Sequence, residues 1–135
     1  MKKIILFLAS IGILVSGDVV FHKKTGLFWQ DNRLTISEKI TYKEAEELCQ
    51  GLTIGGHQDW RIPNLKELLT IVDYKNYDPA ILNGFSSIET STYWSSTEYK
   101  GRDNEVWGVN FKTGATDSNS KNYDRYIRCV RVAQK

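Results

Sequence analysis

The chain has 135 residues, of which 41% are hydrophobic and 25% charged, with 18 Lys or Arg residues against 16 Asp or Glu. Lys2 and Lys3 account for the whole surplus of +2, since without them cations and anions are equal in number. A domain of balanced charge has no electrostatic attraction for nucleic acid or for an anionic membrane, so we expect neither as a partner.

The first 17 residues have the composition of a secretory signal peptide. Two lysines precede an apolar run from Ile4 to Val15, and small residues follow it. A retained membrane anchor is the alternative, but a spanning helix needs roughly 20 apolar residues and this run is shorter. The sequence therefore predicts a signal peptide at 1–17, a single domain at 18–135, no membrane span after cleavage, and a periplasmic or secreted protein.

The first elements predicted in the domain are a β-hairpin and a helix. The apolar stretches 19–21 and 27–29 flank a short polar turn, which is typical of a hairpin. Thr41 and Glu44 then have the spacing of a helix-capping box, and apolar residues follow at helical intervals. Cys49 belongs to that apolar set, so we expect it on the buried face of the helix.

A second helix and several strands are predicted after it. Asn64 and Glu67 have capping-box spacing before a leucine-rich stripe. Segments 92–97, 105–111 and 126–132 are rich in β-forming residues and predict strands. The order hairpin, helix, helix, then antiparallel strands and loops predicts an α+β domain.

Cys49 and Cys129 are the only cysteines of the chain. In an oxidising compartment two cysteines most simply pair with each other. The bond would close a loop of about 80 residues, for which the chain-entropy model gives roughly 4.5 kcal/mol of stabilisation. A thiolate metal site is the alternative, but neither cysteine has a second Cys or His at zinc spacing. We therefore predict a structural disulfide that holds the first helix against the last strand.

Four short motifs follow one another along the chain. They are TGLFWQ at 25–30, GHQDWRIPNLKEL at 56–68 with Cys49 upstream, YWSST at 93–97 and RCVR at 128–131. Together they resemble the Lcl C-terminal domain family, a bacterial group named after the terminal domain of a collagen-like adhesin. The resemblance extends over nearly all of residues 21–132.

This resemblance implies a fold and a type of function. The family is similar to C-type-lectin-like domains and to formylglycine-generating enzymes. That similarity implies two helices packed on a small antiparallel sheet, with long loops and a helix-to-strand disulfide. The adhesin implies binding to glycans or to matrix proteins, which is an argument by analogy.

We interpret most residues of the motifs as structural. Aromatic bodies with polar tips pack well in a loop-rich core, and a neighbouring arginine can bond to backbone or to a carboxylate. An exposed tryptophan would instead form a stacking platform for a sugar or aromatic ligand. The structural interpretation applies to Trp29, Trp60, Arg61, Pro63, Glu67, Trp107 and Arg128.

Two polar loops, 98–105 and 116–124, are the candidate ligand site. Their side chains could hydrogen-bond to sugar hydroxyls or bind calcium, although solvated loops have the same composition. No EPN-like or QPD-like calcium motif of lectins occurs. Calcium is thus possible but unsupported, and no cofactor is predicted. The candidate ligand-binding residues are Trp94, Glu98, Arg102, Asp103, Asn104, Glu105, Asp117, Asn119, Asn122 and Asp124.

No catalytic motif is evident in the sequence. His22 and His57 are isolated, and GxSxG, HExxH and phosphate-loop patterns do not occur. A formylglycine-generating activity would need reactive cysteines, whereas the two present fit the disulfide better. The sequence predicts a non-enzymatic binding module for a glycan or protein ligand. The alternatives are a sulfatase-modifying enzyme and a structural partner in an envelope complex.

Overall fold

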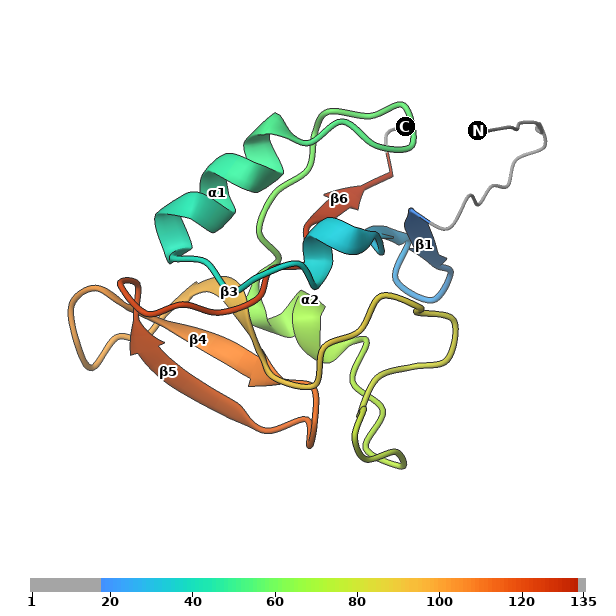
Figure 1. Ribbon diagram of the computed structural model, residues 1–135. Coiled ribbons are helices and arrows are strands. Elements are labelled where there is room, and N and C mark those ends of the chain that lie inside the picture. The colour runs from blue at the N-terminus through green and yellow to red at the C-terminus, as the bar shows by residue number, and fades with distance from the viewer. Residues whose placement is uncertain (1–17, 134–135) are drawn as a thin grey trace.

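The computed structural model describes residues 18–133, so the predicted signal peptide at 1–17 lies outside the described residues. The domain has two α-helices, a short 3₁₀ helix and two small antiparallel sheets, joined by long loops as Figure 1 shows. The predicted α+β class is confirmed, with two three-stranded sheets where the sequence predicted one. Within residues 18–133, no helix is long and apolar enough to cross a membrane.

The first sheet joins the two ends of the domain. It consists of β1 (Val19–His22), β2 (Leu27–Gln30) and β6 (Val130–Val132), with β2 in the middle. The β1–β2 hairpin turns at Gly26, whose φ of 75° is a conformation that glycine adopts without strain. Because β6 pairs antiparallel with β2, the last described strand lies beside the first hairpin.

The second sheet consists of β3 (Thr92–Glu98), β4 (Glu105–Asn110) and β5 (Thr116–Ser120). β5 corrects the prediction of a polar loop over 116–124. Its sequence has little β propensity, but all five of its residues are in register with β4. The backbone ladder with β4 therefore holds the strand, while its polar side chains remain partly or fully exposed.

Both predicted capping boxes begin helices at the expected residues. Thr41 precedes α1 (Tyr42–Gly51), and Asn64 precedes α2 (Leu65–Leu69). In α2 the Glu67 N–H donates to the Asn64 side chain at 2.8 Å, and the Asn64 N–H donates to the Glu67 carboxylate at 2.9 Å. These reciprocal bonds satisfy backbone donors that have no partner inside a helix.

The helices pack on opposite faces of the second sheet. α2 contributes Leu68 to a core that contains Tyr93 of β3. α1 contributes Cys49 to a second core that contains Trp94 of β3. Neighbouring side chains on a strand point to opposite faces, so both faces of β3 are covered at this point.

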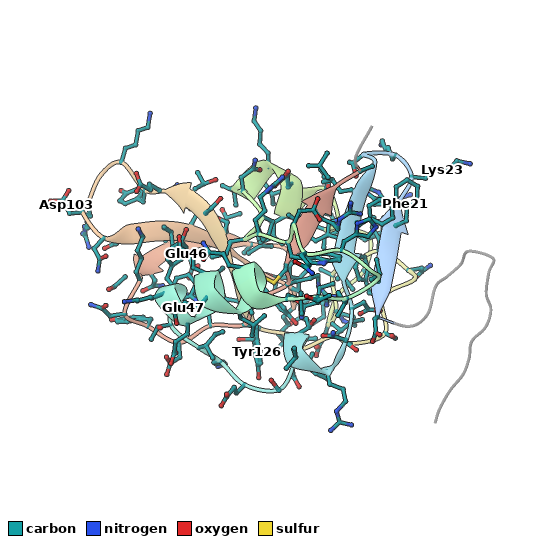
Figure 2. All side chains as sticks on the ribbon, turned by 90° about the horizontal axis from the view of Figure 1, so that it is seen from above. Phe21, Lys23, Glu46, Glu47, Asp103 and Tyr126 are labelled. Atoms are coloured by element: carbon teal, nitrogen blue, oxygen red, sulfur yellow. A yellow bond between two sulfur atoms is a disulfide. The ribbon has the colours of Figure 1, made fainter. Side chains whose placement is uncertain are left out.

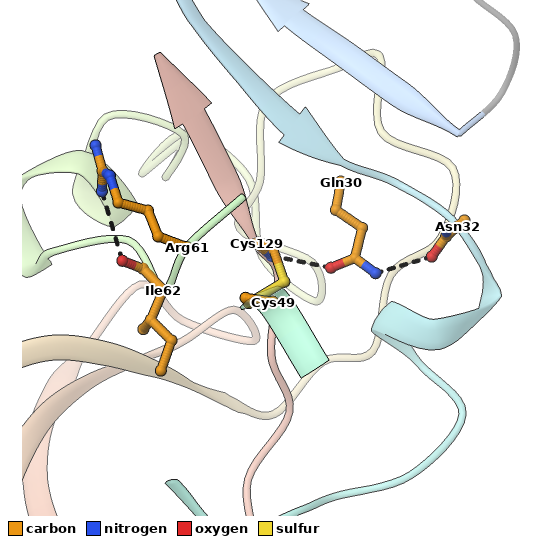
Figure 3. The surroundings of a disulfide bond; sticks show 6 residues. All are labelled: Gln30, Asn32, Cys49, Arg61, Ile62 and Cys129. Atoms are coloured by element: carbon orange, nitrogen blue, oxygen red, sulfur yellow. Dashed lines mark hydrogen bonds between the residues drawn. A yellow bond between two sulfur atoms is a disulfide. The ribbon is translucent and has the colours of Figure 1, made fainter. Parts of the chain in front are cut away.

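The predicted disulfide is confirmed. Cys49 of α1 is bonded to Cys129, directly before β6, across a sequence separation of 80 residues. Figure 3 shows how the first sheet supports this bond: the Cys129 N–H donates to the Gln30 side chain at 2.9 Å, and the Gln30 amide donates to Asn32 at 3.0 Å. Both cysteines are fully buried, so the bond fixes α1 to the sheet from inside the core.

Arg128 forms a second link between distant segments. Its guanidinium is 1% exposed and donates to the carbonyl oxygens of Gln30 at 2.7 Å and Ser87 at 2.6 Å. It also pairs with Asp31 at 3.2 Å, and that carboxylate accepts the N–H groups of Ser86 and Ser87. One buried ion pair thus attaches the loop around residues 82–91 to the end of β2.

Candidate functional site

The motif around Arg61 holds the start of α2. Trp60 is 3% exposed, and its indole N–H donates to the carbonyl of His57 at 3.1 Å. The Arg61 guanidinium donates twice to the Glu67 carboxylate, both times at 2.8 Å, while Glu67 also caps the helix. A planar guanidinium facing a carboxylate in this way fixes orientation as well as charge. The motif therefore positions the backbone of residues 60–64.

The charges of this pair stabilise each other. Burial raises the pKa of Glu67, but hydrogen bonds from Arg61 and from the Asn64 N–H outweigh it, so the pKa lies below its usual value. The hydrogen bond to Glu67 likewise raises the pKa of Arg61. Both groups are therefore ionised at neutral pH, and Arg61 is already paired.

The YWSST motif forms an irregularity in β3 that also binds the α2 region. The pairing register with β4 shifts between Trp94 and Glu98. In this segment the Ser96 N–H donates to the Pro63 carbonyl at 2.8 Å. The Leu65 N–H donates to the Thr97 hydroxyl at 2.8 Å. The extra residues of a bulge redirect side chains, and here they meet the start of a helix.

Trp94 does not lie at the surface, which corrects its place among the candidate ligand-binding residues. It is 0% exposed, and its indole N–H donates to the Ile40 carbonyl at 2.8 Å. The ring of Tyr42 packs against it almost at a right angle, with ring centroids 5.6 Å apart. Trp94 is buried because α1 covers the face of β3 on which it lies, so it presents no surface to a ligand.

The loop between β3 and β4 forms a hollow of about 280 Å³, which we call the loop hollow. It brings together five of the predicted ligand-binding residues. Figure 2 shows Asp103 at the tip of this loop, far from the first sheet. The residues that line the hollow are Glu98, Tyr99, Lys100, Arg102, Asp103, Asn104, Glu105 and Lys121.

The lining of the loop hollow has balanced charge, with three cations and three carboxylates. Arg102 lies 3.6 Å from Glu105, and Lys121 lies 4.0 Å from Glu98. The Lys121 N–H donates to the Asn104 carbonyl at 2.9 Å, which ties the turn after β5 to the loop. The hollow thus offers both donors and acceptors without an excess of either charge.

The other candidate residues lie outside the loop hollow. Asp117 and Asn119 belong to β5, and Asn122 and Asp124 lie in the segment that follows. The exposed Asp117 carboxylate is 3.7 Å from Arg125. From the second predicted loop only Lys121 reaches the hollow, and sequence reasoning missed it because one lysine in a polar segment has no distinguishing signal.

A second hollow of about 260 Å³ lies between α1 and the start of α2, and we call it the helix hollow. Lys121 connects it to the loop hollow, since its Nζ lies 4.8 Å from the centre of the Tyr42 ring. A signal for it existed in the sequence, because residues 42, 46 and 50 have the four-residue spacing of one helix face. The lining residues are Tyr42, Glu46, Gln50, Arg61, Ile62, Asn64 and Ser96.

The electrostatic environment of the helix hollow favours neutral or positive groups. Burial raises the pKa of the Tyr42 phenol, and the Glu46 and Glu98 carboxylates raise it further. Tyr42 is therefore an uncharged hydroxyl group at neutral pH, capable of donating a hydrogen bond. The same two carboxylates disfavour any anion placed beside it.

Neither hollow contains an obvious metal centre. Across residues 18–133 there is no group of three or more His, Cys, Asp or Glu side chains that could hold a metal ion. Glu98, Asp103 and Glu105 line one hollow together with cations, two of which pair with Glu98 and Glu105.

The comparison with protein families agrees with these motifs. The family model described as the Lcl C-terminal domain matches residues 18–131, which run from β1 into β6. The chain belongs to the Lcl C-terminal domain family. No curated protein matches the chain in sequence. In this Lcl C-terminal domain the four motifs build the start of α2, the bulge in β3, the disulfide and the Arg128 links, whereas the loop hollow is lined entirely by residues outside them.

Proposed function

We propose that this Lcl C-terminal domain is an exported, non-enzymatic binding module that recognises a glycan or protein ligand through the loop hollow, as an adhesin domain would. One observation carries the proposal: a hollow lined by polar side chains of balanced charge lies on a loop outside the structural motifs. Binding residues are found disproportionately on loops that a rigid scaffold positions.

Export is part of the proposal and has two supports. The segment 1–17 has the composition of a signal peptide. A disulfide that joins α1 to the end of the chain is typical of oxidising compartments such as the periplasm and the exterior of the cell. Bacterial origin and adhesion are proposed on the family's name and so rest on analogy.

The lining predicts weak individual contacts. Arg102 is 75% exposed, and the two ion pairs of the hollow, Arg102–Glu105 and Lys121–Glu98, lie in contact with solvent. A neutral hydrogen bond contributes about 0.5–1.5 kcal/mol net, which corresponds to roughly a two- to tenfold change in affinity. The ligand would therefore be bound by several such contacts, as extended or repeated ligands allow.

An array of glycans and matrix proteins, probed with and without calcium, tests the proposal. We expect the wild-type domain to bind a discrete set of ligands and Arg102→Ala to weaken that binding about two- to tenfold. Arg33→Ala is the matched control, because Arg33 is exposed on the short 3₁₀ turn Arg33–Thr35, outside the loop hollow. An empty array, or equal loss in both variants, would contradict a site at the loop hollow.

A free-thiol assay separates this proposal from the sulfatase-modifying alternative. Both cysteines of the chain are paired in one disulfide. A binding module held by that bond has no titratable thiol in its native state. Reactive thiols in the native protein, together with turnover of a cysteine-containing peptide, would favour the enzyme.

A further inference from the structure

The helix hollow has one carboxylate without a partner. The exposed Glu46 side chain makes no hydrogen bond or ion pair with another residue in the range 18–133, although it lines the hollow. Around it lie the Gln50 and Asn64 amides and the Ser96 hydroxyl. Amide and hydroxyl groups each donate and accept hydrogen bonds, so this lining can match a ligand with several hydroxyl groups.

The cations near the hollow are already occupied. Arg61 is held by Glu67 through two bonds of 2.8 Å. Lys121 lies between the Glu98 carboxylate, at 4.0 Å, and the ring of Tyr42. In the part of the chain that the structure describes, no cation therefore pairs with the exposed Glu46 carboxylate. Burial is the main cause of the raised pKa of Tyr42, and the Glu46 carboxylate adds to it.

We propose that the helix hollow binds a sugar unit with a free amino group, whose ammonium pairs with the Glu46 carboxylate. The hydroxyl groups of the sugar would bond to the amides of Gln50 and Asn64. The inference rests on the proposed binding role and assigns a ligand class to a second hollow.

The lining favours an amino sugar over a lysine side chain of a protein. A lysine carries a single charge at the end of an apolar four-carbon stem, which would leave the polar groups of Gln50, Asn64 and Ser96 without a partner. A sugar places its charge and its hydroxyl groups within one compact ring, so it can bond to these groups and to Glu46 together.

Three oligosaccharides of equal length test the proposal: oligomers of glucosamine, of N-acetylglucosamine and of glucose. Binding is measured by NMR titration at about pH 6, where an amine with a pKa near that of an α-amino group, about 7.7–8.0, is protonated. We expect the glucosamine oligomer to bind most tightly and to shift the signals of α1. A lysine-containing peptide is titrated in the same way, to test for a protein ligand.

Two variants of neighbouring residues locate the binding. Glu46→Gln keeps the shape of the side chain but removes its charge, and we expect it to weaken glucosamine binding about three- to fivefold, as for an exposed ion pair. Glu47→Gln is the matched control, since Glu47 is exposed on the same helix (Figure 2) and does not line the hollow. We expect it to leave binding unchanged.

Equal binding of the three oligosaccharides, equal loss in both variants, or a preference for the peptide would overturn the inference. Arg102→Ala separates this outcome from the failure of the proposed function. If glucosamine binding survives that variant while the array signal is lost, the two hollows act independently. An array signal without any amine preference would contradict the amino-sugar site alone.

Discussion

Arg128 shows how one side chain can support several segments of a loop-rich domain. Its guanidinium contacts the faces of Phe85 and Tyr93, at 4.8 and 5.7 Å from the ring centroids, and donates to two backbone carbonyls. Asp31 supplies the opposite charge and is 2% exposed. A buried charge that loses its partner remains poorly solvated, which makes such pairs sensitive to truncation.

We predict that Arg128→Ala lowers the free energy of unfolding by about 3–5 kcal/mol, because it leaves Asp31 buried without its counter-charge. Arg102→Ala, which removes a 75% exposed arginine, should change it by less than about 1 kcal/mol. Urea denaturation of both variants provides the measurement. Similar losses in the two variants would mean that the buried pair is not an important support.

The second scale is that of the helices and strands, where Glu67 serves both as a cap and as the partner of Arg61. We predict that Glu67→Ala lowers the free energy of unfolding by about 1–2 kcal/mol, the sum of a cap and a partly exposed pair. Glu44→Ala is the control, since Glu44 caps α1 and the structure pairs it with Thr41 alone. It should cost about half as much. Thermal unfolding measures both, and a larger effect at Glu44 would contradict the account.

Glu67 should also make the stability of the domain depend on pH in the acidic range. The pKa of Glu67 is lower in the folded domain than in the unfolded chain, where it is about 4.3. Its contribution is therefore present above about pH 4.3 and is lost as the pH falls through the lower folded value. The free energy of unfolding of Glu67→Gln should therefore change less over this pH range than that of the wild type. An equal pH dependence of stability in the two proteins would contradict this.

The sequence predicts some of these elements correctly and others wrongly, for physical reasons. A capping box is local, so Thr41 and Asn64 identified the starts of both helices before any tertiary information. The strand β5 is stabilised by its ladder with β4 and not by its own residues, so composition indicated a loop. Alternation along a strand cannot reveal that helices cover both faces of its sheet, so the sequence wrongly predicts Trp94 as a ligand-binding residue.

At the scale of the whole molecule, the disulfide joins the first helix to the end of the chain. Cys49→Ala combined with Cys129→Ala should lower the free energy of unfolding by about 2–5 kcal/mol, since the bond restricts an 80-residue loop in the unfolded chain. Urea denaturation of the double variant against wild type measures this. Equal stability of the two proteins would show that the cores alone hold the domain together.

Only part of the candidate site can be predicted from the sequence. The polar segment 98–105 forms a single hollow, because its residues are neighbours along the chain. The contribution of Lys121 depends on the pairing of β5 with β4. The helix hollow depends on the disulfide, which fixes α1 to Cys129, next to the residue that pairs with Arg61. The spacing of residues 42, 46 and 50 indicates one face of α1 but not the segment that this face meets, so neither Lys121 nor the helix hollow was predicted.

The proposal that the loop hollow is the binding site has a matched test within the chain, because Lys121 lines that hollow and Lys75, in the same sequence context, does not. The tetrapeptide Lys-Asn-Tyr-Asp occurs twice, at 75–78 and at 121–124, and each copy has an exposed tyrosine. Array binding should be measured for Lys121→Ala and for Lys75→Ala. We predict that Lys121→Ala weakens array binding about two- to tenfold and that Lys75→Ala leaves it unchanged. Retained binding by Lys121→Ala with loss in Lys75→Ala would contradict it and place the ligand at the exposed loop of Tyr74 and Tyr77.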